Sequence, residues 1–337
     1  MYVCLMDNRK AFDVVWHSGL FIQLYNIGIR NKMWHVIIDA YTGIINSVMY
    51  NGQESKTFDV SQSTRQGSLW GAMFYLVVIN PLIQAIRKLD VGAYIGNIFS
   101  GVHVQADDIA LVSTSPTAMQ QMIDVCYKYS CNWRFVIHPE KTVMIHWGKN
   151  ANNFKWAVGA DKIKVVDSHT HCGILLSNRP STIQRTKEAC RKGRGIMASL
   201  ACTDVLEKGQ VNPITALKVY KSVVLTSSLF GCELWCNLTG TEELMLERLQ
   251  RYCVKLIQNL KKQTRSYMCC AMLGLGSLIG YIFNGIKLKF LRRLLVLPNH
   301  TVSKQIVLFR IFQAQSYLKD KMEVYVMNFI NYVKSTP

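Results

Sequence analysis

The most informative stretch of this chain is Gln105-Ala106-Asp107-Asp108, which stands between two runs of β-branched and apolar residues, 99–104 and 109–112. Both runs are typical of short strands, so the residues between them are predicted to form a tight turn. Two adjacent carboxylates at a hairpin tip repel each other. A divalent cation would compensate this charge, and Mg²⁺ bound by one or two carboxylates is typical of phosphoryl-transfer sites. The alternative is a solvated acidic turn.

A second acidic strand end lies close to the N-terminus. Residues 1–6 form an apolar run that ends at Asp7, and Lys10-Ala11-Phe12-Asp13 follows it. If this strand pairs with the hairpin in one sheet, in a split β-α-β arrangement, Asp7, Asp107 and Asp108 can bridge two metal ions about 3.5–4 Å apart. The alternative for Asp7 is a solvated strand end, and Asp13 is explained by a charge pair with Lys10 on a first helical turn.

Five short segments occur in an order that is typical of one protein family. They are Asp7 with Lys10-Ala11-Phe12-Asp13, Arg65-Gln66-Gly67-Ser68, Ala106-Asp107-Asp108, His138-Pro139-Glu140-Lys141-Thr142 and His171-Cys172-Gly173-Ile174. In this order they resemble motifs A to E of the reverse transcriptases of non-LTR (LINE-type) retrotransposons. The resemblance covers roughly residues 1–297 and begins at motif A.

The resemblance implies an α+β fold. Residues 1–178 would form the reverse transcriptase palm, a split βαβ-type sheet with helices, which we expect to lack the fingers region because only six residues precede Asp7. Residues 179–297 would form a basic, all-α, thumb-like region, and residues 298–337 a C-terminal helical extension. Asn178-Arg179-Pro180 is the expected joint, and the later helices are expected over 182–201, 212–229, 242–260 and 278–297.

The resemblance also implies the activity of an RNA-directed DNA polymerase that uses two-metal nucleotidyl transfer. Asp7, Asp107 and Asp108 would hold two Mg²⁺ ions, which Mn²⁺ could replace, and Lys141 would protonate the leaving pyrophosphate. An RNA template, a DNA primer and a dNTP would be the substrates. The alternative for Lys141 is a solvated surface lysine.

Four further residues carry implied roles in nucleotide and template binding. Phe12 would lie under the incoming sugar and exclude a 2′-hydroxyl, although core packing with Val15 and Trp16 also explains it. Arg65, Gln66 and Gly67 would contact the template or the nucleotide, at a point where Ser68 is a plausible N-cap for an apolar helix over 70–86 that Asn80-Pro81 interrupts. The alternative is a polar loop with a cap.

Charge is distributed unevenly along the chain. Through Pro180 there are 16 Lys and Arg against 12 Asp and Glu, and from Ser181 onward 23 against 9. A basic second half is what binding an RNA–DNA duplex requires. We expect Arg191, Lys192, Arg194, Lys218 and Lys221 to contribute most.

The cysteines and one apolar stretch bear on metal binding, secretion and membrane insertion. The eleven cysteines show no C-x-x-C spacing, and their odd number together with the absence of a signal peptide indicates reduced thiols in the nucleus or cytoplasm rather than secretion. We interpret His169, His171 and Cys172 as turn or strand residues rather than a metal cluster. Residues 267–286 carry no charge, but their glycines favour buried helices over a membrane span. The sequence indicates no obligate protein partner.

Two functions therefore remain open. The first is a polymerase that is truncated and weak or inactive as written. The second is a catalytically silent remnant that binds nucleic acid through its basic half. Two departures from the family pattern occur at positions that the resemblance implies lie near the primer. Gln105 stands where the family usually has an aromatic residue, and His171-Cys172 stands where it has Tyr-Leu.

Overall fold

The computed structural model describes residues 1–65, 67–148, 154–178, 183–202, 212–235 and 238–317. The chain divides into two compact units. Unit 1 comprises Met1–Cys172 and Leu176–Asn178, and unit 2 comprises Gly173–Leu175 and Arg179–Pro337. Some residues of the sequence predictions lie outside the described residues: Gln66, Arg179, Pro180, Ser181, residue 182 at the start of a predicted helix, and residues 318–337 of the predicted C-terminal extension.

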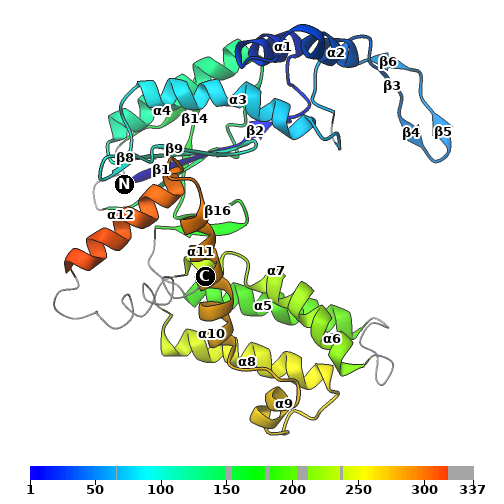
Figure 1. The fold of residues 1–337 in the computed structure, drawn as a ribbon, viewed down its shortest axis with the longest axis vertical. Coiled ribbons are helices and arrows are strands. Elements are labelled where there is room, and N and C mark those ends of the chain that lie inside the picture. Colours follow the sequence, from blue (N-terminus) through cyan, green and yellow to red (C-terminus); the bar gives the residue numbers. More distant parts are fainter. Residues whose placement is uncertain (66, 149–153, 179–182, 203–211, 236–237, 318–337) are drawn as a thin grey trace. The chain divides into compact units, whose positions relative to one another are not determined.

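Unit 1 is built around a mixed sheet with helices on one face (Figure 1). The five strands of this sheet lie in the order β15 (Lys164–Val165), β12 (Val143–His146), β1 (Tyr2–Met6), β10 (Asp108–Ser113) and β9 (Val102–Gln105). All neighbours are antiparallel except β12 and β15, which are parallel. The central position of β1 is what gives the acidic end of this strand two neighbours.

The helices of unit 1 are α1 (His17–Asn26), α2 (Asn31–Tyr41), α3 (Gly71–Lys88) and α4 (Pro116–Trp133). Ser115 caps α4, accepting a hydrogen bond from the Ala118 amide, and Pro116 occupies its first turn, where a proline costs no hydrogen bond. The predicted break at Asn80-Pro81 is wrong, because α3 runs through Pro81 with buried residues on both sides of it. The packing of its apolar face outweighs the hydrogen bond that proline removes.

The side chains of β1 alternate between the two faces of the sheet, and a separate hydrophobic cluster covers each face. Cys4 and Met6 pack with Ile109 in the core under α3 and α4, whereas Val3 and Leu5 join a smaller cluster on the opposite face. Successive side chains of a strand point to opposite faces, so both faces of β1 are buried and its sequence is apolar throughout.

Short two-residue strands complete unit 1. They are β2 (Asn8–Arg9), β3 (Ile45–Asn46), β4 (Met49–Tyr50), β5 (Gln53–Glu54), β6 (Phe58–Asp59), β7 (Tyr94–Ile95), β8 (Ile98–Phe99), β11 (Val136–Ile137), β13 (Ala157–Val158) and β14 (Asp161–Lys162). The four-residue strand β16 (Ser168–His171) follows, and β17 (Ile174–Ser177) belongs partly to each unit. The single strand expected over 99–104 is divided here between β8 and β9, because residues 100 and 101 form a bend between them.

Unit 2 is helical. Its elements are α5 (Ile183–Ala201), α6 (Pro213–Val219), the π-helical turn η1 (Tyr220–Leu225), α7 (Thr226–Ser228), the 3₁₀ turn η2 (Cys232–Leu234), α8 (Gly240–Ile257), α9 (Ser266–Met272), α10 (Leu278–Gly280), the π-helical turn η3 (Tyr281–Lys287), α11 (Leu288–Val296) and α12 (Val302–Tyr317). Thr239 caps α8 and forms a capping box with Glu242. Within the described residues, no helix has the length and apolarity that crossing a bilayer requires.

Candidate active site

The pairing of β1 with β10 brings two of the predicted acidic residues to the same place. Met6 is opposite Ile109 in this antiparallel pair, so the next residues, Asp7 and Asp108, lie opposite each other at the end of the sheet. By the alternation of the strands, both belong to the face turned away from α3 and α4. The structure therefore places Asp7 and the Asp-Asp hairpin side by side, as the sequence analysis expected.

The hairpin tip itself is a two-residue turn. Gln105 and Asp108 form the last paired residues of β9 and β10, so Ala106 and Asp107 make the turn. Ala106 has a φ of 55°, a left-handed conformation that is uncommon for residues other than glycine. This turn sets Asp107 beyond the end of the sheet, one residue ahead of Asp108.

The chain changes partner directly after Asp7. Asn8 and Arg9 leave the large sheet and pair with β11, and the Asp7 carbonyl accepts a hydrogen bond from the His138 amide at 2.8 Å. A tight turn over 138–142 follows β11, closed by two hydrogen bonds from Thr142 to the His138 carbonyl. This turn carries Lys141.

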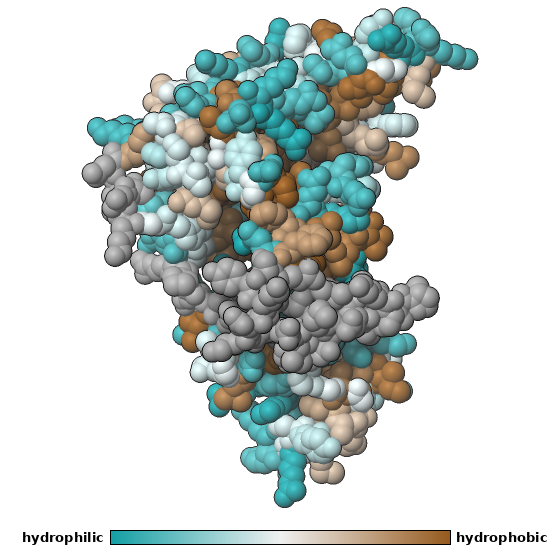
Figure 2. Space-filling model, turned by 60° about the vertical axis from the view of Figure 1, so that its left-hand side comes forward, coloured by the Kyte–Doolittle hydropathy of each residue, from teal (hydrophilic) through white to brown (hydrophobic). Residues whose placement is uncertain are grey.

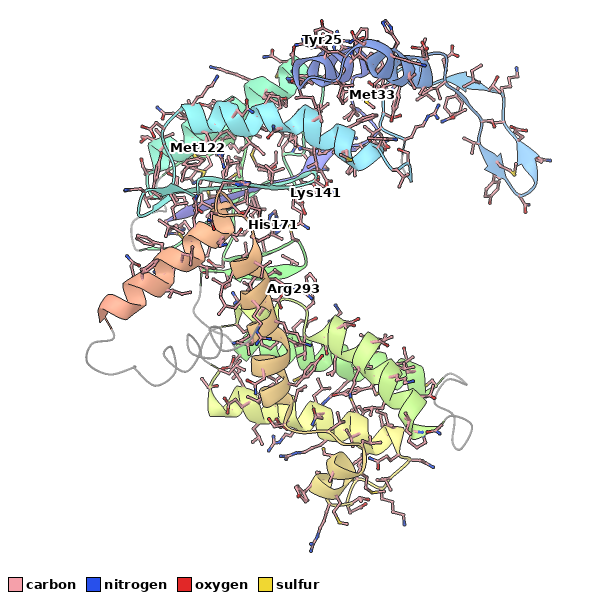
Figure 3. The ribbon with its side chains drawn as sticks, viewed as in Figure 1. Tyr25, Met33, Met122, Lys141, His171 and Arg293 are labelled. Carbon is pink, nitrogen blue, oxygen red and sulfur yellow. The ribbon has the colours of Figure 1, made fainter. Side chains whose placement is uncertain are left out.

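Lys141 contacts the carboxylate of Asp7 directly. Its Nζ lies 3.2 Å from Oδ2 of Asp7, and the lysine side chain is 63% exposed against 28% for the aspartate. Figure 3 shows Lys141 beside the central sheet. The residue expected in motif D is thus brought to the carboxylate expected in motif A.

Two pockets meet at Asp7 and Lys141. The first encloses about 370 Å³ and is lined by Asp7, Asn8, Arg9, Lys10, Ala11, Phe12, Asp13, Asp107, His138 and Lys141. The second encloses about 410 Å³ and is lined by Leu5, Met6, Asp7, Asp108, Glu140, Lys141, Val143, Lys164, Val166, His169, Thr170, His171 and Cys172. The three carboxylates therefore face pockets wide enough for a small polar ligand.

Phe12 lines the first pocket together with Asp7 and Asp107. Its ring lies 4.7 Å from that of the buried Tyr75 on α3, centroid to centroid, so it is packed on one side and half-exposed on the other. Lys10 to Val14 form a turn rather than the helical turn expected around Asp13, because α1 begins only at His17. Phe12 is therefore held by aromatic contact with α3 and not by helical spacing.

Arg65 and Gly67 line neither of these two pockets. The Arg65 guanidinium donates to the Ala40 carbonyl at 3.0 Å and lies over the Tyr41 ring, and the residue lines a different pocket of about 710 Å³ that shares Asp13 with the first. Gly67 has a φ of 83°, a left-handed conformation that glycine tolerates best. Gln66 lies outside the described residues.

The helix after this segment begins later than expected. The first residue of α3 is Gly71, whose amide donates to the Ser68 hydroxyl at 3.0 Å. A Cβ at Gly71 would lie only 2.6 Å from the Arg65 carbonyl oxygen, so a larger residue would push this backbone apart. Gly71 was not among the site residues predicted from the sequence.

Asn8 and Tyr75 were also missed. The buried Asn8 amide donates to the Tyr75 hydroxyl and to the Asp107 carbonyl, both at 3.3 Å. Burial raises the pKa of Tyr75 to about 12, so its hydroxyl stays neutral at physiological pH. This bridge ties the strand end at Asp7 to the hairpin tip and to α3. The only sequence signal was the position of Asn8 next to Asp7.

His171 and Cys172 border Asp108. The Cys172 thiol donates to Asp108 Oδ2 at 3.5 Å, and burial is the main cause that raises its pKa. Burial is also the main cause that lowers the pKa of His171, against the opposing effect of the Asp108 charge. The imidazole is therefore largely neutral at physiological pH.

In unit 2, four basic residues gather on α5 and α8. A pocket of about 440 Å³ is lined by Lys187, Cys190, Arg191, Arg194, Met245 and Arg248. Of the five basic residues named from the sequence, Arg191 and Arg194 line this pocket, whereas Lys192, Lys218 and Lys221 are exposed outside it. Glu188 pairs with the Arg191 guanidinium at 2.6 Å, which lowers the pKa of this glutamate.

Comparisons with known proteins agree with this geometry. The family described as Reverse transcriptase (RNA-dependent DNA polymerase) matches residues 1–173. The RNA-directed DNA polymerase from mobile element jockey of Drosophila funebris is 21% identical over 244 residues, which are 69% of this chain and 25% of that protein. The Retrovirus-related Pol polyprotein from type-2 retrotransposable element R2DM of Drosophila melanogaster is 24% identical over 123 residues, 36% of this chain and 12% of that protein.

Similarity to a solved structure is weaker. A telomerase structure from Candida tropicalis aligns with 99% of this chain and 49% of its own, at 10% identity and a TM-score of 0.39. The chain spans between an eighth and a quarter of the length of the two curated relatives named above. Because the family match covers half of the chain and the curated relatives come from non-LTR retrotransposons, this chain belongs to the reverse transcriptase (RNA-dependent DNA polymerase) family of LINE-type elements.

Proposed function

We propose that this protein copies RNA into DNA by nucleotidyl transfer at the end of the β1–β10 pair. The observation that supports it best is the position of Asp7 opposite Asp108, with Asp107 on the adjoining turn. Nucleotidyl transfer needs carboxylates that can bridge two cations, and neighbouring strand ends supply them.

The donors at this place fit Mg²⁺. Asp7 and Asp107 line one pocket, and they offer only oxygen ligands, which is what a small hard cation prefers. Asp7 and Asp107 would hold the ions, with Asp108 in support. When bound, the two cations would activate the primer hydroxyl and neutralise the charge of the triphosphate.

The protein residues around this pocket have separable roles in the proposal. Lys141, in contact with Asp7, would supply a proton to the leaving pyrophosphate. Phe12, fixed against Tyr75, would form the wall under the sugar of the incoming nucleotide. Asn8 would hold the hairpin tip at a constant distance from β1 through its two hydrogen bonds.

Unit 2 would bind the RNA–DNA duplex. Lys187, Arg191, Arg194 and Arg248 present four positive charges around one pocket, and phosphate contacts carry most of duplex affinity. The Arg191 guanidinium is already paired with the Glu188 carboxylate. Arg194, Lys187 and Arg248 are therefore the stronger candidates for phosphate contacts.

Primer extension on an RNA template tests the proposal. The purified chain is compared with an Asp107→Ala/Asp108→Ala variant, and an Asp39→Ala/Asp59→Ala variant removes two exposed carboxylates away from the pockets as a matched control. We expect extension that requires a divalent cation, that the first variant lacks and that the control keeps. Equal extension by all three proteins would overturn the assignment. Duplex binding without extension by any of them would support the catalytically silent alternative.

A further inference from the structure

We propose that Asp108, His171 and Cys172 form a binding site for a thiophilic divalent cation such as Zn²⁺, distinct in chemistry from the proposed Mg²⁺ pair. One ligand atom from each of these residues lies within 4.8 Å of the other two. Cys172 Sγ and Asp108 Oδ2 are already 3.5 Å apart. His169, which the sequence analysis grouped with His171 and Cys172, lines the same pocket but does not belong to this set.

The separations suit tetrahedral zinc. Zinc binds cysteine sulfur at about 2.3 Å and histidine nitrogen or carboxylate oxygen at about 2.0–2.2 Å, which places neighbouring ligand atoms roughly 3.3–3.8 Å apart. Shifts of about 1 Å, within the reach of side-chain rotations, would bring the three atoms to these values. The fourth position faces the pocket of about 410 Å³, so water can fill it.

The backbone explains why two neighbouring residues reach one point. In an extended strand, His171 and Cys172 would point to opposite faces of β16. Cys172 instead has a φ of 49°, a left-handed conformation that ends the strand and breaks the alternation. The imidazole and the thiol consequently both border Asp108, which the start of β10 holds in place.

The donor set selects the metal. A thiolate and an imidazole favour Zn²⁺ over Mg²⁺, whereas Mg²⁺ prefers carboxylate, carbonyl and water oxygens. Binding would release the thiol proton of Cys172 to solvent, because the thiolate is the ligand. Sequence alone did not indicate this set, since Asp108 is distant in the chain from the other two ligands.

A consequence follows for the polymerase, and this consequence rests on the proposed function. A zinc ion on Asp108 would engage one of the three carboxylates proposed for nucleotidyl transfer. Zn²⁺ would then inhibit extension in the presence of saturating Mg²⁺. Binding itself does not depend on catalysis and is measured separately.

The test uses the full chain with Co²⁺ and Zn²⁺ as probes. We expect one equivalent of Co²⁺ to give a thiolate-to-cobalt charge-transfer band, and Zn²⁺, but not excess Mg²⁺, to abolish it. Cys172→Ser should remove the band, and both Cys172→Ser and His171→Asn should weaken Zn²⁺ binding at least tenfold, roughly the scale that even outer partners of a metal site reach. Cys131→Ser and Cys202→Ser, which remove exposed thiols outside the pocket, should leave binding unchanged.

Either of two outcomes would overturn the inference. One is the absence of a charge-transfer band in the wild-type chain, and the other is equal Zn²⁺ affinity in Cys172→Ser and in the Cys131→Ser control. Circular dichroism of each variant shows that a loss is not due to unfolding, and His171→Asn gives an independent second variant. If extension is measurable, the Zn²⁺ concentration that halves it should rise in Cys172→Ser. A chain without polymerase activity would still bind Zn²⁺, so failure of the proposed function and failure of this site are distinguishable.

Discussion

Lys141 places its Nζ 3.2 Å from Oδ2 of Asp7, although the two residues are far apart in the sequence of the palm. The contact exists because β2 and β11 pair directly after Asp7, and the turn that follows β11 brings the lysine back. Both groups are partly exposed, so water screens the pair and its contribution to stability is small. The contact matters for position, because it holds the lysine Nζ next to a carboxylate that is proposed to hold a metal ion.

The first prediction concerns this lysine. Lys141→Ala should lower the rate of nucleotide addition by roughly 100-fold, the scale of a lost general acid, and Lys141→Arg should recover little because arginine donates its proton poorly. Single-turnover primer extension over a range of pH measures both. Lys128→Ala, an exposed lysine on α4 that lines neither pocket, should extend normally. A loss of duplex affinity equal to the loss of rate would mean that Lys141 only attracts the substrate.

The second prediction concerns Phe12. Because this ring is packed against Tyr75 at the pocket wall, Phe12→Ala should open space for a 2′-hydroxyl. The ratio of kcat/KM for a dNTP to that for the matching rNTP should fall roughly tenfold or more. Because both kcat/KM values are measured on the same protein preparation, their ratio does not depend on how much of the protein is folded. Phe21→Ala, which removes an aromatic residue outside both pockets, provides the comparison. An unchanged ratio in Phe12→Ala would favour the interpretation of Phe12 as core packing alone.

The third prediction concerns the stability of the hairpin tip. Asn8→Ala removes two hydrogen bonds in a buried place and leaves the Asp107 carbonyl without this donor. It should lower the free energy of unfolding by about 1–3 kcal/mol. Urea denaturation followed by circular dichroism measures the change. Asn80→Ala, at an exposed helical position of α3, should be neutral or slightly stabilising. An equal change in the free energy of unfolding for Asn8→Ala and Asn80→Ala would show that the two hydrogen bonds of Asn8 contribute nothing to stability.

The fourth prediction concerns thiol reactivity. Burial raises the pKa of both Cys126 and Cys253 to about 12, so at pH 8 only on the order of one thiol in ten thousand is ionised at these positions. Cys131 and Cys202 are exposed. Iodoacetamide at pH 8 followed by mass spectrometry should label the two exposed cysteines, and should label Cys126 and Cys253 only after denaturant is added. Rapid labelling of Cys126 in the native protein would contradict the packing of α4 against the sheet.

The fifth prediction concerns the basic pocket of unit 2. Removing three charges in Lys187→Ala/Arg194→Ala/Arg248→Ala should reduce the slope of log affinity against log salt by about 3 if each contacts one phosphate. Fluorescence anisotropy with an RNA–DNA duplex measures the slope. A second variant, in which the exposed Lys261, Lys262 and Arg265 become alanine, loses the same charge elsewhere on the unit. A uniform fall in both variants would indicate general attraction and no defined duplex site.

Large hydrophobic side chains remain exposed in unit 1, including Leu69 at 92% and Tyr50 at 81%, and Figure 2 shows hydrophobic residues among hydrophilic ones on the surface. Surface of this kind favours association between copies. Binding measurements should therefore be made at low protein concentration, with the oligomeric state checked by light scattering.

Much of the palm could be predicted because its signals are local. A tight turn at Asp107 and an apolar strand ending at Asp7 each depend on residues a few positions apart. The helices of unit 2 were predictable for the same reason, since α5 and α8 repeat their buried residues at helical spacing. Pro81 was misread because its local cost is real, and only the buried faces around it show that α3 continues.

The sequence by itself determined the strands β1 and β10, most of the helices of unit 2 and the carboxylates that stand at the strand ends. Only the tertiary structure decided that Lys141 contacts Asp7, that Asn8 bridges Asp107 and Tyr75, and that Asp108 faces His171 and Cys172. The physical reason is that side-chain periodicity is a property of neighbouring residues. Strand order and register are instead set by the packing of the whole core, where β1 pairs with both β10 and β12.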